Sequence, residues 1–393
     1  DMHVGNVMIQ PDAPPGERMF VLDLHRVRIG RIRRKDVVRM LVYLADSTGK
    51  RGVGGRTRIR FLRRVVEQWK GEGYLTKKRL RRWNRRVRKA WTKHHRDHVR
   101  SRTKRCLVDS SEFTPDVSPH FKVYRRRDFP LSRALELTRE HDRALDGLSS
   151  SCEIIKDGSR TAVTCCEEAT GGRIFVKAFC RKTITERFKD IIRWRSRART
   201  AWVAHRAFRV RDVPAVPALC VMEAKNTLSG RPDYLITRDP GIMADLEVVA
   251  KAQAADHPLH DDLNLSAEKR RQIAAAVAGL FRRMADSRVR HRDMKPSNIL
   301  VKEGEEGGFD LWLVDMDRAV VEVDWTRRLW IYHLAQCNAG LDRGIGLLDR
   351  MRCLREIGRG RWTAQQRLSI ARKVLDLSLD RDPMWLRDPQ YPR

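Results

Sequence analysis

The 393-residue sequence lacks any apolar run of about 18 residues, so no membrane-spanning helix is predicted. It also lacks a Cys-x-x-Cys pair, although it contains eight cysteines. In so long a chain this pattern favours free thiols in a reducing cytoplasm over a disulfide framework. The cysteines are Cys106, Cys152, Cys165, Cys166, Cys180, Cys220, Cys337 and Cys353.

Acidic residues are scarce relative to basic ones. The sequence has 50 Asp and Glu against 82 Lys and Arg, which gives a formal net charge of +32. Such a chain is expected to contact polyanions: an anionic membrane face, a phosphorylated glycolipid or nucleic acid. A solvated basic surface with no dedicated partner is the alternative. Hydrophobic residues make up an ordinary 41%, so a core can form and a low-complexity polymer is excluded.

The most basic segment runs from Leu75 to Arg105. Within it, Leu80, Trp83, Val87 and Trp91 are spaced three, four and four residues apart, which predicts a helix with one apolar stripe. The other positions are nearly all Arg and Lys. The segment is therefore either a packed helix with a solvated basic face or a docking face for anionic lipid or nucleic acid.

One pattern of residues occurs twice, with the copies 292 residues apart. It consists of an aspartate, an asparagine five residues later and a second aspartate 22 residues after the first. A period of this length indicates a duplicated domain. In each copy, two apolar segments and a Gly- or Pro-containing turn predict a hairpin that brings amide and carboxylate together. The members are Asp1, Asn6 and Asp23 in the first copy, and Asp293, Asn298 and Asp315 in the second.

Strands are predicted upstream of the second copy, at 152–156, 160–165, 174–178, 219–222 and 234–237. Lys177 follows three apolar strand residues, so its ammonium is expected inside a cleft, in contact with the α- and β-phosphates of a nucleotide. A surface position on an edge strand is the alternative. Ser266 is expected to cap a long helix that leads to the second copy.

The segment from His291 to Asn298 reads His-Arg-Asp-Met-Lys-Pro-Ser-Asn and is followed by an apolar triplet. It resembles the catalytic loop of the protein-kinase-like superfamily. Further segments make the sequence similar to the lipopolysaccharide kinase (Kdo/WaaP) family, whose members phosphorylate inner-core sugars at the cytoplasmic membrane face. These segments are Arg195 to Ala198, Trp202, Val213-Pro214, Tyr234 to Thr237 and Val314 to Ala319.

The resemblance covers about 152–377 as a complete copy and 1–105 as a remnant. It implies an α+β, protein-kinase-like two-lobed fold with an antiparallel sheet N-lobe and a mainly helical C-lobe, preceded by a partial second kinase-like C-lobe. The expected domains are 1–109 (partial C-lobe), 110–150 (linker and connecting helix), 151–240 (N-lobe) and 241–393 (C-lobe). Asp1 is itself the first member of the repeated pattern, so the chain looks truncated at its start. The first copy lacks its ATP-binding lobe in this chain, so no independent catalysis is expected from it.

Roles follow from the chemistry and the resemblance together. Asp293 would accept or orient the proton of the substrate hydroxyl, and Lys295 would neutralise charge on the transferring phosphoryl group. Lys177 would bind ATP. Asn298 and Asp315 would bind Mg²⁺, which prefers oxygen ligands. Asp317 is either an extra ligand or an ordinary surface acid.

Three features depart from the kinase pattern. The glycine-rich loop is absent, with only Gly158 at the first hairpin. The helix glutamate that usually pairs with the lysine is replaced by Ala201 at its expected place, and Glu186 is an earlier candidate. The metal motif reads Asp-Met-Asp from Asp315 to Asp317.

The sequence therefore predicts an ATP- and Mg²⁺-dependent kinase that acts on a sugar hydroxyl of a lipopolysaccharide-type glycolipid. It would be cytoplasmic and peripheral at the inner membrane face, with nucleic acid the less favoured partner. A protein Ser/Thr or Tyr kinase is one alternative, although no Ala-Pro-Glu segment follows Asp315. A basic pseudokinase that acts as a binding module is the other.

Overall fold

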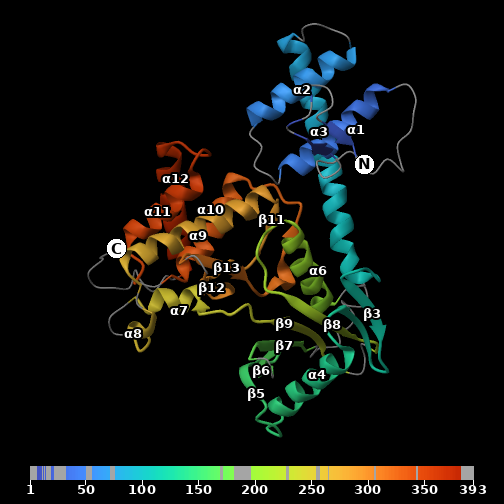
Figure 1. Ribbon diagram of the computed structural model, residues 1–393. Coiled ribbons are helices and arrows are strands. Elements are labelled where there is room, and N and C mark those ends of the chain that lie inside the picture. Colours follow the sequence, from blue (N-terminus) through green and yellow to red (C-terminus); the bar gives the residue numbers. More distant parts are fainter. Residues whose placement is uncertain are drawn as a thin grey trace. The chain divides into compact units, whose positions relative to one another are not determined.

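A computed structural model divides the chain into two compact units, Asp1–Ser101 and Arg102–Arg393 (Figure 1). The described residues are 7–10, 12, 14, 19–21, 32–49, 55–70, 76–168, 171–180, 196–226, 230–253, 257–263, 265–304, 307–341 and 344–381.

The first unit contains a short hairpin and helices that pack through apolar stripes. Residues Leu80, Trp83 and Val87 of one helix are buried in its core, as the spacing predicted. The first-copy residues Asp1, Asn6 and Asp23 lie outside the described residues, so the kinase-like remnant stays a prediction. The elements are the antiparallel strands β1 (Val7–Ile9) and β2 (Met19–Val21), the helices α1 (Arg34–Gly49) and α2 (Gly55–Lys70), and most of helix α3 (Lys77–Lys104), which ends in the second unit.

The second unit begins with a seven-stranded sheet in which every neighbouring pair is antiparallel. Its order is β3-β4-β8-β9-β7-β6-β5. The strands are β3 (Phe113–Val117), β4 (Phe121–Arg126), β5 (Cys152–Asp157), β6 (Thr161–Glu167), β7 (Arg173–Phe179), β8 (Ala218–Ala224) and β9 (Asp233–Arg238). The helices of this lobe are η3 (Arg105–Leu107), α4 (Leu131–Leu145) and α6 (Arg197–Val210).

Residues 110–150 form part of this sheet lobe, so the prediction of a linker was wrong, although the helix expected in this segment is present as α4. The Ser- and Pro-rich start forms edge strand β3, and β4 pairs with both β3 and β8. Pro115 is compatible with β3 because an edge strand has one side without a hydrogen-bonded neighbour. The Ser- and Pro-rich composition of this segment suggested a linker. Composition carries no information about which strands elsewhere in the chain pair with it.

The two faces of the sheet are covered differently. On one face, Leu137 of α4 packs in a cluster with Val176 and Ile236 of the sheet. On the other, Trp202 of α6 packs with Phe179 and Leu235. Successive strand residues point to opposite faces, so the strands β4, β7, β8 and β9 contribute to both clusters.

The second lobe is mainly helical and packs around one large apolar core. Its longest helix, α9, starts after Ser266, whose side chain accepts a hydrogen bond from the backbone N–H of Lys269 at 3.2 Å, as predicted. None of the described helices is long and apolar enough to cross a bilayer. The helices are α7 (Leu246–Lys251), α8 (His260–Leu263), α9 (Ala267–Asp286), η5 (Pro296–Asn298), η6 (Met316–Arg318), α10 (Arg327–Ala339), α11 (Leu347–Gly358) and α12 (Ala364–Leu379), and the short strands are β10 (Ala244–Asp245), β11 (Val289–Arg290), β12 (Ile299–Glu303), β13 (Phe309–Leu313) and β14 (Val320–Val321).

Together these lobes confirm the predicted α+β class, with an antiparallel sheet lobe followed by a helical lobe. The predicted hairpin of the second copy is formed by β12 and β13, with Ile299 opposite Leu313. This pairing places the residues on either side of the hairpin, Asn298 and Val314, next to each other, and the Val314 N–H donates to the Asn298 carbonyl at 3.2 Å.

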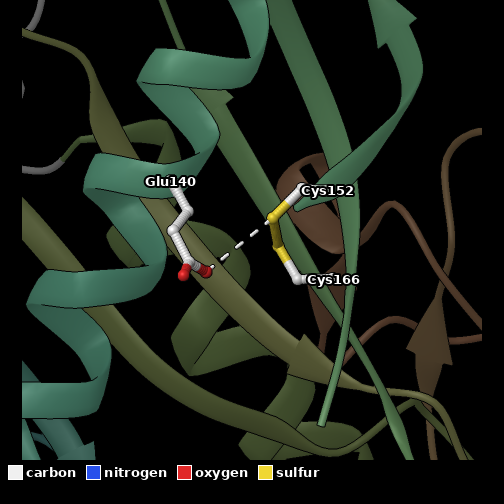
Figure 2. Close-up of side chains that lie close together, drawn as sticks. All are labelled: Glu140, Cys152 and Cys166. Carbon is white, nitrogen blue, oxygen red and sulfur yellow. Dashed lines mark hydrogen bonds between the residues drawn. A yellow bond between two sulfur atoms is a disulfide. The ribbon is translucent and has the colours of Figure 1, made fainter. Parts of the chain in front are cut away.

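Cys152 and Cys166 form a disulfide, so the prediction of free thiols was wrong for this pair. They lie directly opposite each other on β5 and β6, with Cα atoms 4.3 Å apart. Figure 2 shows the bond facing Glu140 of α4, and one Glu140 oxygen lies 3.9 Å from the Cys152 sulfur. The pairing depends on strand register, which the 14-residue sequence separation does not reveal.

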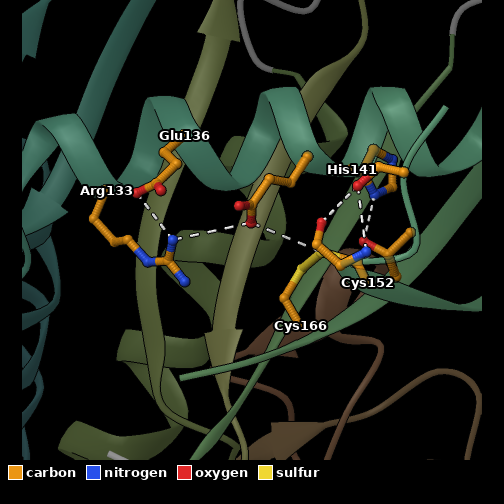
Figure 3. The surroundings of a disulfide bond; sticks show 9 residues. Arg133, Glu136, His141, Cys152 and Cys166 are labelled. Carbon is orange, nitrogen blue, oxygen red and sulfur yellow. Dashed lines mark hydrogen bonds and ion pairs between the residues drawn. A yellow bond between two sulfur atoms is a disulfide. The ribbon is translucent and has the colours of Figure 1, made fainter. Parts of the chain in front are cut away.

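The polar groups around the disulfide are bonded mainly to one another (Figure 3). Arg133 lies 2.9 Å from Glu136 and 3.9 Å from Glu140. His141 Nδ1 lies 2.8 Å from the Thr164 hydroxyl. Glu140 and the two sulfurs are close enough together to hold a metal ion, but the disulfide leaves no thiolate and Arg133 already brings a positive charge to Glu140. This cluster is therefore a structural element of the α4 face.

Candidate active site

A cleft of about 860 Å³ lies within the second unit, between the sheet and the helical lobe. Residues of β5, β6, β7, α6 and β9 line it from the sheet lobe, and the 293–298 and 314–318 segments line it from the helical lobe. All five residues predicted from the sequence line this one cleft. They are Lys177, Asp293, Lys295, Asn298 and Asp315.

Neutral His291 holds the predicted catalytic loop against the end of β13. Its Nε2 lies 2.7 Å from the Val314 carbonyl, and its Nδ1 lies 3.2 Å from the backbone N–H of Asp293. These partners require Nε2 to donate and Nδ1 to accept. Burial lowers the pKa of His291, which favours this neutral tautomer at pH 7.

The side chain of Asn298 closes the same loop. Its Nδ2 donates to the backbone carbonyl of Asp293 at 2.8 Å, which leaves Oδ1 as an acceptor. Lys295 Nζ lies 3.2 Å from Asp293 Oδ2. The loop thus presents a carboxylate, an ammonium and an amide oxygen within a few residues of chain.

Lys177 and Asp315 form an ion pair that joins the two lobes across the cleft. Asp315 has a left-handed backbone, with φ 59° and ψ 50°, which non-glycine residues adopt rarely and at a cost of about 1 kcal/mol or more. Burial acts to raise the pKa of Asp315, but the charge and hydrogen bond of Lys177 outweigh it, so the pKa lies below its ordinary value. The carboxylate is therefore ionised at neutral pH.

The helix glutamate that usually pairs with the lysine has no counterpart among the described residues of the cleft. Ala201, which stands at its expected place, lines the cleft from α6. Glu186 lies outside the described residues. Instead, α6 is joined to the metal motif by a cation: Arg197 Nη2 lies 2.6 Å from Asp317 Oδ2, and its Nε lies 3.1 Å from the same oxygen.

The Arg197–Asp317 pair was missed by sequence reasoning, which left Asp317 as either a ligand or a surface acid. The Asp317 side chain is only 6% exposed, so it is not a surface acid. A separation of 120 residues hides the pairing. Two features of the sequence could have indicated this pair. Helix α6 has no glutamate at the expected place, and the motif has a second aspartate, Asp317.

Asp239 organises the passage between the lobes. One of its oxygens accepts from Arg173 Nε at 2.8 Å, and the other accepts from the backbone N–H groups of Gly241 and Ile242 at 2.9 Å each. Asp239 thus ties strand β7 to the segment that leaves β9 and fixes one wall of the cleft. Its side chain is 4% exposed.

The donor set at the base of the cleft suits a hard divalent cation. Asn298 offers an amide oxygen, and Asp315 offers an ionised carboxylate next to it in the β12–β13 hairpin. Mg²⁺ prefers such oxygen ligands and usually keeps several waters. Asp315 is paired with the Lys177 ammonium in this structure. A metal ion bound to Asp315 would therefore take the place of that ammonium as its cationic partner.

Comparison with known proteins identifies the segment that contains this cleft. Residues 153–335 match a family model. The model is that of the lipopolysaccharide kinase (Kdo/WaaP) family. The matched segment is therefore a kinase, and it contains every cleft residue predicted from the sequence. The Kdo/WaaP match starts after β3, β4 and α4, although these elements complete the same sheet lobe.

Among solved structures, the chain is similar to WaaP in complex with acyl carrier protein. The two are 21% identical with a TM-score of 0.44, and the match covers 63% of this chain and 97% of that chain. No curated protein matches the chain.

Proposed function

We propose that this protein is an ATP-dependent phosphotransferase that phosphorylates a sugar hydroxyl of a lipopolysaccharide-type glycolipid. The observation that carries the proposal is the convergence of Lys177, Asp293, Lys295, Asn298 and Asp315 on one cleft. They come from both lobes and from sequence positions more than a hundred residues apart. The family of the matched segment supports the glycolipid as acceptor.

Asp293 accepts or orients the proton of the attacking hydroxyl in this proposal. The contacts of His291 and Asn298 with the Asp293 backbone hold it in place, so little reorganisation is needed when the acceptor binds. Lys295 lies beside Asp293 and is largely exposed, at 61%. It is free to turn toward the transferring phosphoryl group and reduce its negative charge.

Lys177 binds the α- and β-phosphates of ATP, and Asn298 and Asp315 hold Mg²⁺. The metal, when bound, neutralises phosphate charge. The low pKa of Asp315 supports this role, because the ligand must be ionised. Arg197 keeps Asp317 in place beside it, so α6 and the metal motif are aligned without a helix glutamate.

We further propose that the enzyme is cytoplasmic and contacts the anionic inner face of the cell membrane through α3. The face of α3 opposite its buried stripe carries exposed cations at helical spacing, over about 27 Å. A straight row of charges on one face suits a flat anionic surface. Each cation near such a surface contributes about 1 kcal/mol to the binding free energy. The cations are Lys78, Arg82, Arg85, Lys89, Lys93 and Arg96.

Nucleic acid is the less favoured partner of this face. Proteins that bind single strands combine cations with exposed aromatic rings on which bases stack. The tryptophans of α3, Trp83 and Trp91, pack instead against the core of the first unit. Among the described residues, the cationic face of α3 therefore offers no stacking platform.

Transfer of labelled γ-phosphate from Mg-ATP tests the function, with a lipopolysaccharide-type glycolipid extract and a protein extract as separate acceptors. We expect label in the glycolipid and its loss in Asp293→Asn. Label in protein alone would instead indicate a protein kinase. Absence of transfer to either acceptor would indicate a basic pseudokinase, for which the missing glycine-rich loop is the supporting observation.

A further inference from the structure

The hairpin that lines the cleft from the sheet lobe lacks the usual means of binding phosphates. Kinases of the protein-kinase type cover the phosphates with a glycine-rich loop. Here the β5–β6 turn has a single glycine, Gly158, followed by Ser159 and Arg160. If this hairpin contacts the phosphates of a nucleoside triphosphate in the cleft, the contacts must come from groups other than the amides of a glycine-rich loop.

A β-bulge turns a lysine of this hairpin toward the cleft. Along β5, Cys152 lies opposite Cys166 and Ile154 opposite Thr164, both on the α4 face. The register then shifts by one residue, so that Lys156 lies opposite Val163, which lines the cleft. Residues directly opposite in an antiparallel pair share a face.

Without the extra residue, Lys156 would lie opposite Ala162 and share the α4 face. Bulges re-aim side chains and are frequent next to active sites. Ile155 is the residue that has no partner in this register, and its insertion places Lys156 among the lining residues of the cleft. The bulge thus moves a positive charge from the structural face to the functional face.

Lys156 differs in its ion pairing from most cations that line the cleft. Most cations that line the cleft are ion-paired: Lys177 with Asp315, Arg197 with Asp317, Arg173 with Asp239, Arg238 with Glu168 and Lys295 with Asp293. Lys156 and Arg160, at the hairpin tip, have no ion-pair partner among the residues that the structure describes. They are therefore available to an anionic ligand.

Gly158 lies in the turn beside the Lys156 side chain. A Cβ at position 158 would approach the Thr161 carbonyl to 3.0 Å and Lys156 Cε to 3.5 Å. The first distance is tight, so a side chain there would crowd the turn, whereas the second is an ordinary van der Waals contact. The one glycine in the turn thus avoids a close approach to the Thr161 carbonyl.

We propose that Lys156 and Arg160 bind the phosphate groups of the nucleotide, with side-chain cations in place of the amides of a glycine-rich loop. This inference rests on the proposed nucleotide-dependent function. It assigns a substrate-binding role to the bulge at Ile155 and to the hairpin tip.

Calorimetric titration of the full chain with adenosine, AMP, ADP and ATP, each with Mg²⁺, tests this role. We expect Lys156→Ala and Arg160→Ala each to weaken ATP binding about tenfold or more, because a charge-assisted hydrogen bond is lost. Adenosine binding should not change. Lys156→Arg should retain most of the affinity, and the KM for ATP should rise in Lys156→Ala while the KM for the acceptor stays constant.

Lys122→Ala is the matched control, since Lys122 is an exposed lysine on β4 of the same sheet and does not line the cleft. The inference is overturned if Lys156→Ala binds ATP as tightly as the wild type does. An equal loss of adenosine and ATP affinity also overturns it, because that result indicates a distorted hairpin. A wild-type protein that binds no nucleotide overturns the proposed function and this inference together.

Discussion

The face of the seven-stranded sheet that α4 covers differs in chemistry from the face that lines the cleft. On the α4 face, apolar side chains such as Leu137 and Val176 are fully buried, and polar groups such as His141 bond to near neighbours. On the cleft face, Lys177 reaches across to Asp315 in the other lobe. The same strands supply both faces because side chains alternate.

This difference separates stability from chemistry in adjacent residues of one strand. Val176 and Ala178 belong to the α4-side core, whereas Lys177 between them belongs to the cleft. Changes on the cleft face should therefore alter turnover and leave the free energy of unfolding nearly constant. Changes on the α4 face should do the reverse.

The largest effect is expected from Asp293→Asn in the cleft. Removal of a general base typically costs between about 10² and 10⁴ in rate, and we expect kcat to fall at least about 10³-fold with little change in ATP affinity. Label transfer gives kcat, and calorimetry gives the ATP affinity. Retention of most of the turnover would show that Asp293 is not the base.

On the α4 face, Leu137→Ala should lower the free energy of unfolding by about 2–5 kcal/mol, because it leaves a cavity in a fully packed core. Turnover per folded molecule should be unchanged. Urea unfolding gives the free energy of unfolding. Label transfer, divided by the concentration of active molecules from active-site titration, gives the turnover per folded molecule. Leu148→Ala is the control, since Leu148 is 67% exposed, and it should change stability by less than about 0.5 kcal/mol.

Lys177→Met tests the ion pair that joins the lobes. We expect kcat/KM for ATP to fall about 10²-fold, because a charge directed at the phosphates is lost. The melting temperature should change by only a few degrees, since a partly exposed ion pair contributes little to stability. A large loss of stability with unchanged kcat/KM would reverse the assignment of the two faces.

The smallest effect should be a pH dependence from His141 on the α4 face. Burial lowers the pKa of His141 to about 4, below the value of about 6.5 in an unfolded chain. The unfolded state therefore binds a proton first as the pH falls, so stability present above pH 6.5 is lost progressively toward pH 4.

We expect His141→Gln to reduce this pH dependence by up to about 2 kcal/mol between pH 7 and pH 5. Urea unfolding at the two pH values measures it. An unchanged pH dependence in the variant would mean that His141 is not buried in its neutral form. His205 and His333, whose pKa values burial lowers to about 3, remain in both proteins and supply the background.

Local patterns in the sequence predicted much of the cleft. The His291–Asn298 loop, the β12–β13 hairpin and the strand that carries Lys177 are each encoded by contiguous residues, and the structure brings them together. Pairings between distant segments were not predictable. The membership of β3 in the sheet, the Cys152–Cys166 bond and the Arg197–Asp317 pair all depend on register or packing between segments.

The bulge at Ile155 shows the same limit on a smaller scale. Strict alternation along β5 assigns Lys156 to the α4 face, and one inserted residue reverses this. Sequence periodicity predicts which residues of a strand share a face only while the register is regular. The departure from regularity occurs at the cleft, where function rather than packing determines the side chain that is needed.

Thermal unfolding with ATP, in the presence and absence of Mg²⁺, tests the central claim most directly, in the wild type and in Asp315→Asn. The account predicts that Mg-ATP raises the melting temperature of the wild type and that the Mg²⁺-dependent part of this rise disappears in Asp315→Asn. A wild type that does not respond to Mg-ATP, or an identical Mg²⁺-dependent rise in the variant, would contradict it.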